Sequence, residues 1–160
     1  MTQDMAESVQ KAAVAETVVR IFHALDDRDW GTIAALTTDP VDIDYPSKLG
    51  GAEKISTEDF VSGLRAFLPG FDSTQHLLAP TVVELETETQ ATVRFHARVT
   101  HVLTEVADVP IWVIGCHYTF GFEHQDDIWK LCSSRVEVLY EEGNRDLETV
   151  ARRRAQPLQT

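Results

Sequence analysis

The chain has 160 residues, of which 43% are apolar and 25% are charged, a composition typical of one soluble globular domain, which we expect to span residues 1–160. Its formal net charge is −12, which makes nucleic acid and anionic membrane surfaces poor partners, because both are bound through Lys and Arg.

The first residues of the chain and its cysteines suggest a cellular location. Residues 1–7 contain neither a basic region nor an apolar run, so we expect no signal peptide. No stretch approaches the ~18 apolar residues of a membrane span. The two cysteines, Cys116 and Cys132, have no metal-type spacing. We therefore expect a cytoplasmic protein with reduced thiols.

The first part of the chain has the periodicity of helices. Residues 5–28 carry apolar side chains at helical spacing, the last of them Leu25. Asp29 can cap a second short helix over residues 30–36. A third helix is predicted over about 57–68, capped by Ser56 or Thr57 and ended by the following Pro-Gly pair.

Asp26 stands in the last turn of the first predicted helix. It shares a helical line with Val19 and Phe22, so its carboxylate can point toward the core. The alternative is that Asp26, Asp27 and Asp29 form a solvated acidic turn, since Asp is seldom buried.

The remainder of the chain is predicted to be mainly strands. They are expected over residues 41–45, 74–86, 91–101, 110–123 and 128–140, with a loop over 46–54 and a C-terminal helix over 146–154. Alternation is most regular from Ala91 to His101, where His101 ends an otherwise apolar row and needs partners for its ring nitrogens. Helices followed by a meander of long strands predict an α+β fold, with helices on one side of a curved antiparallel sheet and an apolar pocket between them.

Asp26, Tyr45 and His101 form a candidate acid–base set. Tyr45 shares the inner face of its strand with Val41 and Ile43, although it can also be a packing aromatic whose hydroxyl reaches water. Imidazole exchanges protons near neutrality, a carboxylate on its other nitrogen fixes the tautomer, and a tyrosine hydroxyl can stabilise a developing oxyanion. The set suits removal of a proton next to a carbonyl, while the alternative is that His101 is a core histidine with satisfied hydrogen bonds.

Other chemistries are less favoured by the sequence. A metal site would draw on His76, His96, His101 and His117, but His96 and His117 fall off the apolar rows and no tight ligand pair occurs. Cys116 lies on an apolar row, which raises a thiol pKa and disfavours a nucleophilic role. No glycine-rich phosphate loop or dinucleotide motif is present. We therefore expect no metal and no cofactor.

Several short stretches resemble scytalone dehydratase and the wider SnoaL-like branch of the nuclear-transport-factor-2-like superfamily. They are Asp26-Asp27-Arg28-Asp29-Trp30, Ile43-Asp44-Tyr45, Glu58-Asp59-Phe60-Val61, Thr74-Gln75-His76 and the strand that ends at His101. The resemblance continues through Trp129-Lys130-Leu131 to Gly143-Asn144 and so covers nearly the whole chain. It implies a cone-shaped, curved mixed β-sheet with N-terminal helices enclosing a deep pocket.

The resemblance also implies roles for four residues. Asp26 matches the carboxylate that orients the catalytic histidine. His101 matches that histidine, which removes the α-proton and delivers a proton to the leaving hydroxyl. His76 matches a second pocket histidine, and Tyr45 a tyrosine that polarises the substrate carbonyl through a bound water.

The expected substrate contacts depart from the family pattern. The family's tyrosine before the aspartate is Leu25 here, a substrate-contacting asparagine falls at Tyr118 and a nearby serine at Cys116. With Trp112, which we expect in the core or the pocket wall, these are the predicted substrate-binding residues. The changes disfavour scytalone itself as the substrate.

The leading hypothesis is therefore a cofactor-independent dehydratase acting on a small hydrophobic β-hydroxycarbonyl compound of the polycyclic or aromatic-precursor type. An isomerase or aldol-type polyketide cyclase using the same proton abstraction is the alternative. A non-catalytic ligand-binding module is the third. The relatives also suggest a homo-oligomer, either a dimer or a trimer.

Overall fold

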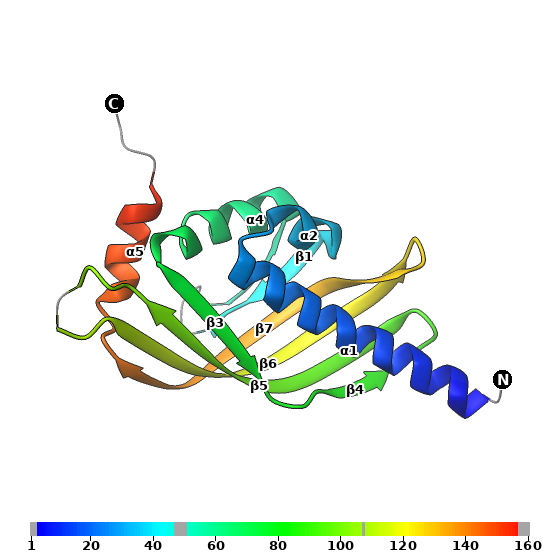
Figure 1. Ribbon diagram of the computed structural model, residues 1–160. Coiled ribbons are helices and arrows are strands. Elements are labelled where there is room, and N and C mark those ends of the chain that lie inside the picture. The colour runs from blue at the N-terminus through cyan, green and yellow to red at the C-terminus, as the bar shows by residue number, and fades with distance from the viewer. Residues whose placement is uncertain (1–2, 47–50, 107, 157–160) are drawn as a thin grey trace.

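The computed structural model describes residues 3–46, 51–106 and 108–156, and it is a mixed α+β structure (Figure 1). Its helices are α1 (Gln3–Asp27), α2 (Trp30–Ala35), α4 (Thr57–Arg65), the 3-10 turn η1 (Leu68–Gly70) and α5 (Leu147–Ala155). Its strands are β1 (Thr37–Asp44), β2 (Ala52–Ile55), β3 (Ser73–Leu78), β4 (Val82–Leu85), β5 (Gln90–Val102), β6 (Ile111–Gln125) and β7 (Ile128–Gly143). None of the described helices is long and apolar enough to cross a membrane.

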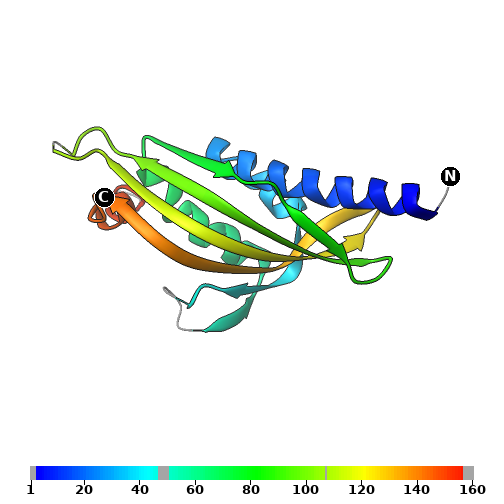
Figure 2. The same cartoon turned by 90° about the horizontal axis from the view of Figure 1, so that it is seen from below.

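The strands of the described residues form one sheet in the order β2-β1-β7-β6-β5-β3, with β4 also paired to β5. All neighbours are antiparallel except β1 and β7, which are parallel, so the sheet is mixed. Figure 2 shows the long strands β5, β6 and β7 curving together beneath α1. The α+β class and the curved mixed sheet with helices on one side are confirmed.

The caps of the helices follow the predicted pattern. The Asp29 side chain accepts the Thr32 N–H at the start of α2, and Ser56 accepts the Asp59 N–H at the start of α4. Each satisfies one of the backbone donors that the first turn of a helix leaves free.

The strand predicted over 74–86 is wrong, because the structure has two shorter strands there. Both pair with β5: Leu78 lies opposite Ala97, and Val82 lies opposite Arg94. The intervening segment contains Pro80, which has no N–H for a ladder. Three residues, 79–81, therefore face only two of β5, and such an extra residue bends a sheet.

The loop predicted over 46–54 is wrong at its end, where β2 lies, and its residues 47–50 lie outside the described part of the chain. β2 pairs with β1 from Val41↔Ile55 to Asp44↔Ala52. Three of its four residues are exposed, so it has no apolar row that a sequence pattern can detect. β1 itself begins at Thr37, four residues before the predicted start, and pairs there with Leu131 of β7.

The core lies between α1 and the inner face of the sheet. The row of β5 from Ala91 to His101 is buried at every second residue, as predicted. Phe22 of α1 lies against it, with its ring centroid 5.6 Å from Phe95 and 5.8 Å from Phe120. These aromatic contacts anchor the C-terminal half of α1, where Asp26 stands, on the sheet.

Helix α5 packs against η1 at the other end of the molecule. A Cβ added to Gly70 would lie 1.9 Å from the carbonyl oxygen of Ala151, so only glycine allows this approach. Leu147 and Ala151 are fully buried in the contact. The contact fixes α5 over the open end of the sheet.

Candidate functional site

A cavity of about 410 Å³ lies between the inner face of the sheet and helices α1, α2, α4 and α5. Most of its wall is apolar, as in most small-molecule sites. The polar or titratable side chains in the interior of the wall are Tyr45, His76, His101, Cys116, Tyr118 and Ser134. Chemistry in the cavity depends on how these few groups are held.

Asp26 and His76 form a hydrogen-bonded pair at this wall. Oδ1 of Asp26 lies 2.7 Å from Nδ1 of His76, and Oδ2 accepts the backbone N–H of the same histidine at 2.9 Å. Burial alone would raise the pKa of Asp26, but the hydrogen bonds and charge of His76, together with Thr74, lower it below its ordinary value. The carboxylate is therefore ionised at neutral pH, as a partner for an imidazole must be.

The predicted pairing of Asp26 with His101 is wrong. His101 instead has its Nδ1 at 3.2 Å from the carbonyl oxygen of Trp112 on the neighbouring strand. The reason is the position of α1, whose end lies over β3, where Thr74 is opposite His101 and His76 is opposite Val99. His76 on β3 therefore reaches the carboxylate, and His101, one strand further in, does not.

The partners of the two rings assign their tautomers. A carboxylate and a carbonyl oxygen only accept, so Nδ1 carries the proton in both His76 and neutral His101. Each Nε2 is then a bare acceptor. In the described part of the chain no side-chain nitrogen or oxygen is buried without a hydrogen-bond partner, so neither Nε2 is sealed in the core. Both rings line the cavity.

His101 is held in a neutral form. Its ring lies among aromatic rings, 4.7 Å from Phe71 and 4.6 Å from Trp112 between centroids. Burial lowers the pKa of His101 to about 4, although the hydrogen bond to Trp112 acts in the opposite direction. His101 is thus an acceptor toward the cavity across the physiological range.

The structure brings the other predicted residues to the same cavity. Leu25, Tyr45, Trp112, Cys116 and Tyr118 all line it. Tyr45 follows directly after β1, and its burial raises its pKa above the ordinary value. Burial likewise raises the pKa of Tyr118 well above its usual range and that of Cys116 to about 11. These groups stay protonated near neutrality and act as hydrogen-bond donors.

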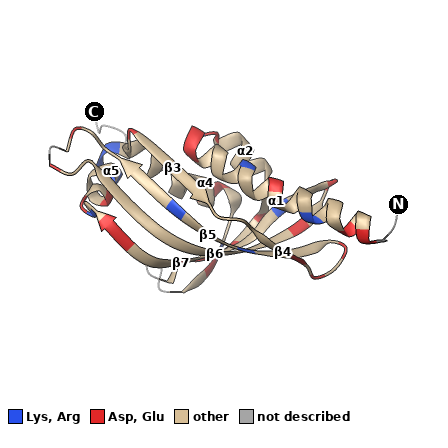
Figure 3. Cartoon of the chain, turned by 60° about the horizontal axis from the view of Figure 1, so that its bottom comes forward, with Lys and Arg blue, Asp and Glu red and all other residues tan. Residues whose placement is uncertain are grey.

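The rim of the cavity is charged. Glu53, Asp59, Glu148 and Arg152 line its outer part. Arg152 has its guanidinium 4.4 Å from the centre of the Phe67 ring and is bonded to Glu148 at 3.3 Å. Figure 3 shows Asp and Glu spread along α1, the loops and the end of β7, with basic residues gathered at α5. An anionic ligand would meet more negative than positive charge at this rim.

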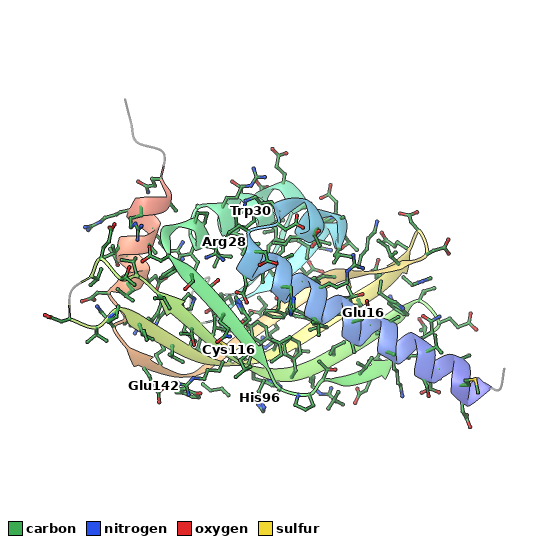
Figure 4. All side chains as sticks on the ribbon, viewed as in Figure 1. Glu16, Arg28, Trp30, His96, Cys116 and Glu142 are labelled. Carbon is green, nitrogen blue, oxygen red and sulfur yellow. The ribbon has the colours of Figure 1, made fainter. Side chains whose placement is uncertain are left out.

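The part of the chain that the structure describes has no set of side chains arranged to bind a metal ion. It holds no group of three or more His, Cys, Asp or Glu side chains able to bind an ion together. His96 and His117 have ring centroids 5.0 Å apart, and His96 is exposed beneath the sheet, away from the cavity (Figure 4).

Thr74 and Arg28 were not among the predicted site residues, although both stand in stretches that carry the family resemblance. The Thr74 hydroxyl donates to Oδ1 of Asp26 at 2.9 Å, and Arg28 donates to that hydroxyl at 2.8 Å. One sequence signal points to Thr74: it precedes His76 by two residues, so both face the same side of a strand. Nothing in the local pattern points to Arg28, whose role depends on where α1 meets β3.

Comparison with known proteins places the chain in a family. The sequence model of the SnoaL-like domain matches residues 6–135. The chain belongs to the SnoaL-like family. No curated protein matches its sequence.

Solved structures show the same fold as this SnoaL-like protein. The Kfla4162 protein from Kribbella flavida is 24% identical, with a TM-score of 0.82 over 91% of this chain and 99% of that one. A putative scytalone dehydratase from Novosphingobium aromaticivorans is 18% identical, with a TM-score of 0.74 over 88% of this chain and 91% of that one. The LinA-type3 hexachlorocyclohexane dehydrochlorinase from Novosphingobium barchaimii is 17% identical, with a TM-score of 0.72 over 89% of this chain and 95% of that one. A nuclear transport factor 2-like superfamily protein from Salmonella enterica is 13% identical, with a TM-score of 0.68 over 82% of this chain and 92% of that one, and it has the same fold.

Proposed function

We propose that this SnoaL-like protein is a cofactor-independent lyase in which His76, held by Asp26, removes a proton next to a carbonyl group. With a hydroxyl as the leaving group the enzyme is a dehydratase of a β-hydroxycarbonyl substrate. The observation that carries the proposal is the 2.7 Å contact between Nδ1 of His76 and Oδ1 of Asp26 at the wall of a largely apolar cavity.

The elimination balances with these groups alone. Nε2 of His76 takes the α-proton, and the C–H electron pair forms an enolate whose oxygen accepts a hydrogen bond from Tyr45, directly or through water. The enolate then forms the C=C bond as the C–O bond to the β-hydroxyl breaks. The imidazolium returns its proton to the departing hydroxide, which leaves as water. Asp26 stabilises the imidazolium between the two steps.

His101 takes a different role from the one expected from the sequence. Its Nε2 accepts a hydrogen bond from a substrate hydroxyl, because its Nδ1–H is committed to Trp112. A hydroxyl held in this way is oriented for departure. This assigns binding to one histidine and proton transfer to the other.

The named neighbours support the reaction class. A dehydratase removes a proton and a hydroxide, and a dehydrochlorinase removes a proton and a chloride, so both names describe an elimination. The cavity supports a compact hydrophobic substrate by its volume of about 410 Å³ and its apolar wall. Leu25, Cys116 and Tyr118 stand where the family's scytalone contacts are expected, which favours a different ring compound.

A bicyclic β-hydroxy ketone tests the proposal, since a hydroxytetralone becomes a naphthol when it loses water. A panel of such ketones with one to three rings is incubated in heavy water, and mass spectrometry follows both water loss and deuterium uptake at the α-carbon. We expect both with the native protein and neither with His76→Gln or Asp26→Asn. The matched controls are His96→Gln on the outer face of the sheet and Asp27→Asn beside the site, both at exposed positions.

Each other outcome has a definite meaning. Deuterium uptake or a moved double bond without water loss supports the isomerase or cyclase alternative. Ligand binding by the native protein, with neither product nor deuterium uptake across the panel, contradicts catalysis and supports the binding module.

A further inference from the structure

We propose that Arg28 and Thr74 are positioning residues, which together aim one hydroxyl proton at Asp26 and so keep His76 in a single tautomer. The catalytic consequence rests on the proposed function, whereas the effect on the tautomer does not. Neither residue is among those that line the cavity, so both act on the reaction through other residues, and the one they share beside His76 is Asp26.

Arg28 is held in an unusual backbone conformation just after α1. Its φ is 60°, in the left-handed region that a residue with a side chain rarely adopts. The turn is closed by the Asp29 N–H, which donates to the carbonyl of Ala24 at 2.8 Å. The conformation directs the Arg28 side chain back toward β3 and η1 (Figure 4).

Three strong hydrogen bonds fix the guanidinium there. Nη1 donates to the carbonyl of Leu25 at 2.7 Å and to Oγ1 of Thr74 at 2.8 Å, and Nη2 donates to the carbonyl of Leu68 at 2.9 Å. Arg28 therefore joins the end of α1, the start of β3 and η1 in one contact. These three bonds fix the position of the guanidinium relative to Thr74.

The direction of the next hydrogen bond follows from the donor count. A threonine hydroxyl has one hydrogen and two lone pairs, and a guanidinium has only donors. The bond from Arg28 therefore occupies a lone pair of Oγ1, and the hydroxyl hydrogen goes to Oδ1 of Asp26 at 2.9 Å. The chain of donation runs from Arg28 to Thr74 to Asp26.

Asp26 is then held by three donors of fixed direction. Oδ1 receives the Thr74 hydroxyl and the Nδ1–H of His76, and Oδ2 receives the His76 backbone N–H. Hydrogen bonding from Thr74 is among the causes that lower the pKa of Asp26, after burial, which raises it, and the contributions of His76. The side chain of Arg28 reaches this carboxylate through Thr74, and its own bond to residue 26 is to the main-chain carbonyl, at 3.3 Å.

Without the Thr74 hydroxyl the carboxylate loses one of these restraints. Oδ1 is then held by the Nδ1–H of His76 alone, and the preference of His76 for the Nδ1–H tautomer weakens. The Nε2–H tautomer has no lone pair toward the cavity and cannot act as a base. The hydroxyl therefore sets the fraction of the protein that is competent for proton abstraction.

The test compares Thr74→Val, which keeps the shape and removes the hydroxyl, with Thr74→Ser, which restores the hydroxyl. Ring ¹⁵N chemical shifts of His76 in the ligand-free full chain report the tautomer, and the hydroxytetralone assay reports kcat and its pH profile. We expect Thr74→Val to populate the Nε2–H tautomer and to lower kcat by roughly ten- to a hundredfold, by analogy with the loss when the outer hydrogen-bond partner of a metal-binding histidine is removed. Thr74→Ser is expected to recover both.

Controls separate positioning from general stability. Thr119→Val makes the same change on the half-buried outer face of β6 and is expected to leave both readouts unchanged. Arg28→Met is expected to shift the tautomer in the same direction as Thr74→Val. Should Arg28→Met fail to fold, the two Thr74 variants still decide.

Two results overturn the inference. One is a His76 tautomer that is the same in Thr74→Val as in the native protein. The other is an equal loss in Thr74→Val and Thr74→Ser, which shows that the hydroxyl is not what matters. Absence of turnover in the native protein contradicts only the proposed function, because the NMR comparison needs no substrate.

Discussion

His101 lies against Trp112 in two ways: its ring is 4.6 Å from the indole between centroids, and its Nδ1 is 3.2 Å from the carbonyl oxygen of the same residue. The two residues face each other across β5 and β6. Burial among aromatic rings keeps His101 neutral against the opposite effect of this hydrogen bond, whereas His76 donates its Nδ1–H to a carboxylate.

Stability is expected to fall in mild acid because of His101. Its pKa in the folded protein, about 4, lies below the ordinary value of 6.5 that applies to the unfolded chain. The unfolded state therefore binds a proton first, and the free energy of unfolding decreases as the pH falls from about 6.5 to about 4. Integrated over that window the loss approaches about 3 kcal/mol. Urea unfolding at a series of pH values measures it.

The comparison for this prediction is His101→Asn, whose amide can still donate to the carbonyl of Trp112. We expect a flatter dependence of stability on pH in this variant between pH ~4.5 and ~6.5. Parallel curves for the two proteins in that window would show that His101 is not the responsible group.

Activity is expected to separate the two histidines. His76→Gln should lower kcat by a factor of roughly a hundred or more, the usual contribution of a general base. His101→Asn should mainly raise KM for a substrate with a hydroxyl, since a binding contact is lost. The decline in rate on the acid side of the pH–rate profile should persist in His101→Asn, because His101 has a pKa of about 4 and is already neutral at pH 5–8. If His101→Asn instead abolishes that decline, the roles are reversed.

Phe22 is expected to contribute strongly to stability. It is 2% exposed and contacts the rings of His76, Phe95 and Tyr118, with centroids at 5.0, 5.6 and 5.3 Å. Phe22→Ala should reduce the free energy of unfolding by about 3–5 kcal/mol. Val19→Ala on the exposed side of the same helix should have little effect. Chemical denaturation of both variants gives the comparison.

Gly70→Ala is expected to displace α5. The new Cβ would overlap the backbone of Ala151, which cannot move aside like a side chain. We expect faster proteolysis within α5 and weaker ligand binding, since Glu148 and Arg152 leave the rim of the cavity. Gly63→Ala is the control for the proteolysis, because nothing lies within 4 Å of its added Cβ. Equal protection of α5 in both variants would disprove the role of this contact.

Local sequence patterns predicted the residues of the cavity better than their partners. Alternation along β5 placed His101 on the inner face, as the structure confirms. Helical spacing turned Asp26 inward, and the structure has it half-buried beside β3, although Val19 of the same helical line is exposed. Neither pattern predicts the distance between Asp26 and His101, which depends on where α1 crosses β3. The choice of His76 as the partner is therefore a tertiary feature.

The missed strands have similar causes. β2 is short and largely exposed, so it lacks the apolar row by which strands are detected. The parallel pairing of Thr37 with Leu131 joins segments far apart in the chain, and no local periodicity encodes it. Pro80 was visible in the sequence, and its missing N–H explains why one predicted strand is two.

The two halves of β5 serve different tasks. In the first half, Val93 belongs to the core cluster and Phe95 packs on Phe22; in the second half, Val99 and His101 face the cavity. Mutations that tune ligand preference can therefore accumulate in the second half while the first half keeps the chain folded. Such a division of labour allows one scaffold to acquire new substrates without first becoming unstable.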